Sequence, residues 1–152
     1  LELFAGRWRA AVVHLPDDTT LVLHAADAVG ADLADGRSRA LRFGLDDPRQ
    51  ARPSLQHAAD SKYCLRCGVP YEFVAAYVGH LGDYRCPNCG HARPALDVVA
   101  RDIELRGLES SRFRLAMGTH AVDVEVGSPA AAAKRGVHGA RKSKWPALGT
   151  SR

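Results

Sequence analysis

Four cysteines carry the most specific chemistry in this sequence: Cys64, Cys67, Cys86 and Cys89. They form two pairs with two residues inside each pair, which is the spacing of a four-cysteine zinc site. Zinc takes four thiolates at tetrahedral corners, and one tight turn can present two of them to the same ion. Gly68 and Gly90 follow the two pairs, where such a turn requires a positive φ. We therefore predict a structural zinc ion, because four thiolates leave no coordination position for water.

Two other uses of these cysteines fit the sequence less well. A pair of disulfides would suit an oxidising compartment, but no secretory signal is visible, and we expect a cytoplasmic protein. A redox site needs a single C-x-x-C in a βαβ context, not two matched pairs. His80 and His91 lie close enough in the sequence to be alternative ligands, although a solvated or hydrogen-bonded role suits both better.

Aromatic residues gather around the cysteine pairs, at Tyr71, Phe73, Tyr77 and Tyr84. A small zinc module has little core of its own, so these rings are expected to pack over the metal-binding turns. Stacking on the bases of single-stranded nucleic acid is the alternative. Few basic residues interleave with the rings, which favours packing and makes a nucleic-acid partner unexpected.

The segment before the cysteines has the pattern of a parallel α/β sheet, with helices and strands in alternation. Apolar residues three and four apart predict a first helix whose buried face is Leu1, Phe4, Trp8, Val12 and Leu15. The next three elements are expected to be a strand buried on both faces at Thr20–Leu23, a helix at Asp27–Asp35 with Val29 and Leu33 inward, and a strand at Arg39–Phe43. A polar loop over residues 47–60 then leads to the cysteines.

Strand patterns return after the cysteines. Strands are expected at Leu96–Leu105, Arg112–Met117 and Thr119–Val126, forming hairpins packed on the sheet. From Gly127 onward no periodicity is visible, and this tail is predicted to be disordered.

The charge is concentrated in that tail. The net charge is +4, but residues 128–152 hold six basic and no acidic residues, so the rest of the chain has 15 basic against 17 acidic residues. The folded part is therefore not a basic binding surface. A hydrophobic content of 46% argues against disorder throughout. No apolar run approaches the roughly 18 residues of a membrane span.

The cysteine-containing segments Tyr63–Gly68 and Tyr77–Pro94 resemble, in detail, the zinc-ribbon insertion in the central domain of MurT-type Mur ligases. These proteins are the ligase subunits of lipid II isoglutaminyl synthase. Residues Arg7–Ala11 and Asp18–Leu23 look like the helix and strand that lead to that family's Asn-Ala-Asp-Asp motif, and Leu41–Pro48 like the next strand and turn. The resemblance covers roughly residues 3–126.

The resemblance implies an α/β fold: the C-terminal part of a Mur ligase central domain of the P-loop ATPase type, with an inserted four-cysteine zinc ribbon and following β-hairpin strands. The implied division is part of the central domain at 1–60, the ribbon at 61–95, returning strands at 96–126 and the basic tail at 127–152. The family uses ATP and Mg²⁺ to activate the α-carboxylate of D-glutamate in lipid II as an acyl phosphate. Ammonia from a glutamine amidotransferase partner then gives D-isoglutamine in peptidoglycan.

Several departures from the family bear on activity. The sequence has no G-x-x-x-x-G-K-[ST] loop to anchor ATP, and nothing in it matches the family's C-terminal ligase domain. The Asn-Ala-Asp-Asp motif stands as His24–Asp27, in which only Ala25 and Asp27 match. Asp27 and His24 would lie near nucleotide in a complete enzyme, although a helix-capping aspartate and a histidine at a strand end explain them equally well. We expect a fragment of such a ligase, inactive alone, with a tail that is out of frame or wrongly joined.

A second interpretation is a free-standing zinc-ribbon module that binds a protein or a nucleic acid. The cysteines fit both interpretations. The segment from Arg7 to Phe43 favours the ligase, because it has the pattern of part of a larger sheet.

Overall fold

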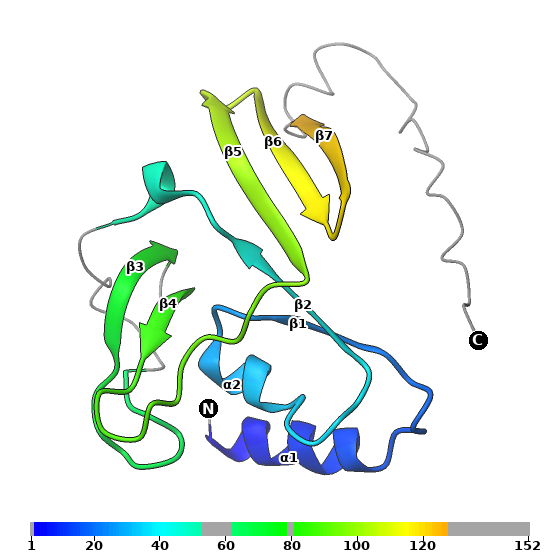
Figure 1. Cartoon of the computed structure of the whole chain (residues 1–152), viewed down its shortest axis with the longest axis vertical. Coiled ribbons are helices and arrows are strands. Elements are labelled where there is room, and N and C mark those ends of the chain that lie inside the picture. The colour runs from blue at the N-terminus through cyan, green and yellow to red at the C-terminus, as the bar shows by residue number, and fades with distance from the viewer. Residues whose placement is uncertain (1, 53–61, 79–80, 128–152) are drawn as a thin grey trace.

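A computed structural model describes residues 2–52, 62–78 and 81–127 of the chain. Its main feature is a five-stranded mixed sheet with the strand order β1-β2-β5-β6-β7 (Figure 1). The strands are β1 (Leu21–His24), β2 (Ala40–Leu45), β5 (Val98–Arg106), β6 (Ser110–Met117) and β7 (His120–Gly127). β1, β2 and β5 run parallel, and β5, β6 and β7 form an antiparallel meander. The predicted α/β sheet is therefore present.

The helices precede and follow β1. Helix α1 spans Glu2–Val13 and α2 spans Ala28–Asp32, and Figure 1 shows them lying beside one another. Asp27 starts α2, because its side chain accepts a hydrogen bond of 3.1 Å from the Val29 backbone N–H, which the first turn leaves unpaired. Neither helix in the described part of the chain has the length and apolarity needed to cross a bilayer.

The burial of residues in α1, β1 and α2 differs from what the sequence predicted. Phe4 and Trp8 of α1 are 60% and 53% exposed, so the predicted apolar face of the helix is not fully buried. Val22 in β1 is 62% exposed, so β1 is not buried on both faces. The residues of α2 that are buried are Ala28, Ala31 and Asp32, whereas Val29 and Leu33 are only partly covered. The small side chains of Ala28 and Ala31 therefore form the face of α2 that is fully covered.

The C-terminal strands form as predicted, but their placement was wrong. They extend the sheet edge to edge, with β5 hydrogen-bonded beside β2, and do not pack on its face. Gly127 ends β7, so the last strand reaches one residue into the predicted tail. The rest of that tail, and residues 53–60 of the predicted loop, lie outside the described residues.

A short 3₁₀ helix, η1 (Pro48–Gln50), follows β2, and the turn that contains it is hydrogen-bonded to β5. Asp102 in β5 has a positive φ of 54°, and the β5–β6 register shifts there. The next residue, Ile103, donates its backbone N–H to Asp47 at 2.8 Å and accepts from the Gln50 side chain at 3.1 Å. The bulge in β5 therefore has its backbone groups paired with the turn after β2.

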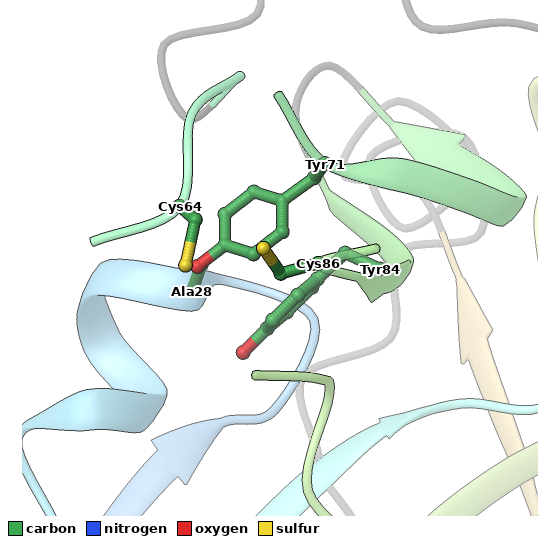
Figure 2. Packing of buried hydrophobic residues seen from close by; sticks show 5 residues of the cluster. All are labelled: Ala28, Cys64, Tyr71, Tyr84 and Cys86. Carbon is green, nitrogen blue, oxygen red and sulfur yellow. The ribbon is translucent and has the colours of Figure 1, made fainter. Parts of the chain in front are cut away.

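The ribbon is the connection between β2 and β5. It contains a two-stranded antiparallel hairpin of β3 (Glu72–Val78) and β4 (Leu81–Arg85). A core cluster of buried residues lies where this ribbon meets α2: Ala28, Cys64, Tyr71, Tyr84 and Cys86 (Figure 2). The core of this part of the molecule therefore sits at the ribbon and not on the broad faces of the sheet.

Candidate metal centre

The four cysteine thiols converge at one end of the hairpin. All four Sγ atoms lie within 4.8 Å of one another. The closest contacts, Cys64 to Cys89 and Cys67 to Cys86, are both 3.4 Å. A disulfide requires about 2.05 Å, whereas a tetrahedron with Zn–S bonds of about 2.3 Å has sulfurs about 3.8 Å apart. The geometry fits one metal ion with four thiolate ligands and does not fit two disulfides.

Each cysteine pair sits in a turn with the same backbone hydrogen bonds. In the first turn, the Gly68 N–H donates to the Cys64 carbonyl at 2.9 Å, and the Cys64 N–H donates to the Val69 carbonyl at 2.8 Å. In the second, Gly90 donates to Cys86 at 3.0 Å and Cys86 donates to His91 at 2.7 Å. Both glycines have a φ of +74°, as the sequence predicted.

The electrostatics of the cluster call for a cation. Burial raises the pKa of the Cys64 thiol, but hydrogen bonds from the Arg66 and Cys67 backbones and from Cys89 outweigh it and lower that pKa to about 5. A hydrogen bond from the His91 backbone lowers the pKa of Cys89, but desolvation and hydrogen bonds shared with Cys64 and Cys86 raise it to about 12. Thiolates held in such a small volume repel one another, and a bound divalent cation would remove this repulsion.

Aromatic rings pack directly against the ligands. Tyr71 and Tyr84 are 7% and 1% exposed, and their ring centroids are 4.9 Å apart. Figure 2 shows both rings beside the Cys64 and Cys86 side chains, close to Ala28 of α2. Tyr77 is buried as well, and Phe73 packs against the cluster. The prediction that rings pack over the metal-binding turns is confirmed for Tyr71, Tyr84 and Phe73, whereas Tyr77 is buried outside this cluster. The buried rings cannot stack on a base.

His91 is hydrogen-bonded and is not part of the four-thiol cluster. Its Nδ1 lies 2.7 Å from the Tyr71 hydroxyl, which also accepts the Leu65 backbone N–H at 3.3 Å. Its Nε2 lies 4.0 Å from a carboxylate oxygen of Asp32, at the end of α2. The hydrogen-bonded role expected for His91 is confirmed, whereas His80 lies outside the described residues.

The two residues expected near a nucleotide stand at the carboxyl end of β1. His24 accepts the Ala26 backbone N–H at 3.2 Å, and its ring meets Phe43 edge to face at 4.9 Å. Asp27 caps α2, as described above. Local structure accounts for these contacts, and a role for Asp27 beside nucleotide stays a prediction.

Two buried carboxylates were not singled out from the sequence. Asp32 is 9% exposed and Asp47 only 3% exposed. Hydrogen bonds from Arg49 and from the Ile103 and Arg49 backbones outweigh the effect of burial and hold the pKa of Asp47 well below its usual range. Aspartates in polar segments are usually solvated, so the pattern carries no signal for their burial. The Asp47-Pro48 turn was visible, but the partner of Asp47 lies far along the chain.

Comparison with known proteins gives a structural relative. No protein-family model and no curated protein matches the chain. Among solved structures, it is similar to a pseudomurein peptide ligase type C from Methanothermus fervidus, with a TM-score of 0.56 and 26% sequence identity over 72% of this chain. The chain spans about 20% of that protein's length. The chain is therefore similar to part of a peptide ligase, which is a Mur ligase-like enzyme.

Proposed function

We propose that this chain contributes a metal-stabilised part of an ATP-dependent carbon–nitrogen ligase of the MurT type. Its reaction would be the amidation of the D-glutamate α-carboxylate of lipid II, with ammonia from a glutamine amidotransferase partner. The observation that carries the proposal is the union of two features. The chain is similar to part of a peptide ligase, and it contains a four-thiol ribbon between β2 and β5. The cysteine-containing segments are those that resemble the MurT-type insertion.

The metal in this proposal is zinc, and its role is structural. Four thiolates saturate the coordination shell, so the ion would neither polarise a substrate nor activate water. Cys64, Cys67, Cys86 and Cys89 would hold it, and it would fix both turns of the ribbon. The loop that anchors ATP phosphates in this family is not present in the sequence, so we assign no step of phosphoryl transfer to these residues.

Nucleic-acid binding, the other use of a ribbon, gains no support from the described residues. Tyr71 and Tyr84 are buried, and two of the three ribbon arginines are paired: Arg66 with Asp35 at 2.7 Å, and Arg93 with Asp83 at 3.4 Å. The third, Arg85, is exposed on β4, and one exposed arginine beside buried rings is not the charged stacking platform that single strands require.

Metal content and turnover of the purified chain test the first part of the proposal. We expect one zinc per chain by elemental analysis and no hydrolysis of ATP, with or without glutamine and Mg²⁺. Replacement of zinc by Co²⁺ should give the intense charge-transfer absorption of a four-thiolate site. Zinc-free protein with free thiols, or ATP turnover by this chain, would contradict the proposal.

A chimera tests the reaction. Residues 2–127 would replace the corresponding segment of an active MurT-type ligase and, separately, of the pseudomurein ligase. We expect the first chimera to retain amidation and to lose it when Cys64 and Cys86 are changed to serine. A folded, zinc-loaded chimera that restores only the pseudomurein enzyme would reject the MurT assignment and keep the ligase one.

A further inference from the structure

The carboxylate of Asp32 is where three separate segments meet. Arg9 of α1 donates to one carboxylate oxygen, and Arg66 of the first cysteine turn lies 3.9 Å from the other. His91, which follows the second cysteine turn, approaches that same oxygen at 4.0 Å. Asp32 itself ends α2 and is 9% exposed. One nearly buried carboxylate thus contacts α1 and both turns of the ribbon.

The two ribbon contacts depend on the geometry of the cysteine turns. Arg66 lies between Cys64 and Cys67, and its backbone N–H donates to the Cys64 sulfur at 3.4 Å. His91 is fixed from both sides, by the 2.7 Å contact to Tyr71 and by its carbonyl, which accepts the Cys86 backbone N–H. Opening of either turn would move the group that covers Asp32.

Helix α1, by contrast, is held mainly through polar contacts. Phe4, Trp8 and Val13 are 60%, 53% and 71% exposed, so little apolar burial fastens the helix. Besides the Arg9–Asp32 pair, Arg37 donates to the carbonyl oxygens of Val12, Leu15 and Pro16 at the C-terminal end. The middle of α1 is therefore held by the pair of Arg9 with Asp32, and its C-terminal end by Arg37.

We propose that metal occupancy of the cysteine cluster controls the docking of α1, with Asp32 as the positioning residue that connects them. With metal bound, Arg66 and His91 cover Asp32 and shelter the carboxylate end of its pair with Arg9, whose own side chain is half exposed. Without metal, the turns open, the carboxylate becomes solvated, and the pair weakens to that of an ordinary surface salt bridge. The inference rests on the metal site proposed above and adds a conformational response to it.

Hydrogen exchange of the full 152-residue chain, reduced and stripped of metal and then titrated with zinc, tests the coupling. In the native sequence, zinc should slow exchange of the α1 amides by about three- to tenfold, together with those of the ribbon. In Asp32→Ala, zinc should still protect the ribbon and should no longer protect α1. Asp35→Asn is the matched control: it removes an exposed partner of Arg66 at the same end of α2 and should keep the coupling.

A second variant covers the possibility that Asp32→Ala disturbs the ribbon itself. Arg9→Gln changes a half-exposed side chain on α1, remote from the cysteines in sequence. Because coupling is reciprocal, it should weaken zinc affinity by the same factor by which zinc protects α1. Zinc binding with unchanged α1 exchange, or persistent α1 protection in Asp32→Ala, would overturn this inference and leave the metal site standing. Failure to bind zinc at all would instead overturn the proposed function.

Discussion

Asp47 provides a sharp test of how the sheet is held together. Its carboxylate, 3% exposed, accepts four hydrogen bonds. The Arg49 backbone N–H donates at 3.1 Å, and its side chain donates through Nε at 2.9 Å and Nη2 at 2.8 Å. The fourth donor is the backbone N–H of Ile103 at the β5 bulge, at 2.8 Å. This side chain therefore fastens the turn after β2 to the strand that joins the two halves of the sheet.

The cost of Asp47→Ala follows from these contacts. Arg49 is half exposed, so water can replace most of what its guanidinium loses. The Ile103 N–H is less easily solvated, and a buried donor left without an acceptor costs about 1–3 kcal/mol. When the loss of the charge-assisted hydrogen bonds from Arg49 is added, we expect Asp47→Ala to lower the free energy of unfolding by about 3 kcal/mol. For a chain of this size that lowers the melting temperature by about 10 °C. Asp47→Asn retains one acceptor and should cost about half as much.

Thermal unfolding followed by circular dichroism measures the effect, with the chain loaded with zinc throughout. Asp46→Asn is the control, because it removes the same charge from the exposed neighbouring residue and should change the melting temperature by less than about 2 °C. If Asp47→Ala has the melting temperature of the native chain, or if both variants lower the melting temperature equally, the Asp47 carboxylate does not hold the bulge and the reasoning fails.

Three further predictions address pH, packing and metal. The pKa of Asp47 is lowered in the folded chain, so its ionised carboxylate contributes fully to the unfolding free energy above the ordinary pKa of about 4. This contribution is lost as the pH falls further. In urea titrations, the difference in unfolding free energy between the native chain and Asp47→Asn should therefore shrink below that pH. In Gly82→Ala, the new Cβ would clash with the Ala75 carbonyl oxygen, so we expect a loss of about 3 kcal/mol of unfolding free energy. Gly6→Ala in α1, where the new Cβ meets nothing, should instead stabilise the chain by about 0.5–1 kcal/mol. In Cys86→Ser, we expect zinc affinity measured against a chelator to drop at least a hundredfold; affinity within tenfold of the native value would show that this thiolate is not a ligand.

The parts of this structure that sequence could predict are those determined by neighbouring residues. Each cysteine turn is formed by two cysteines and one glycine within five positions, so the spacing of these residues is enough to predict the shape of the turn. The strands of the five-stranded sheet alternate or are β-branched over short stretches, and each of these five formed close to where it was expected. No strand was predicted at β3 or β4. The Asp27 cap is likewise encoded within three residues.

The sequence could not show which surfaces and side chains are covered by residues far away along the chain. The periodicity of α1 identifies the face that could be buried, yet Phe4 and Trp8 remain exposed in the described chain. Asp32 and Asp47 are buried because residues far away in sequence, such as Arg9 and Ile103, supply the donors. The edge-to-edge placement of β5 also depends on a pairing with β2 across the entire ribbon, and local pattern does not determine such a pairing.

The position of the ribbon between β2 and β5 has a consequence for the order of folding. The β5–β6–β7 meander closes through short turns, whereas β5 can pair with β2 only after residues 46–97 form a loop. A metal that pins residues 64–89 roughly halves the free chain in that loop, which lowers the entropic cost of closure by about 0.6 kcal/mol. Nascent chains that capture zinc early would therefore assemble the parallel half of the sheet about three times faster than chains that capture it late.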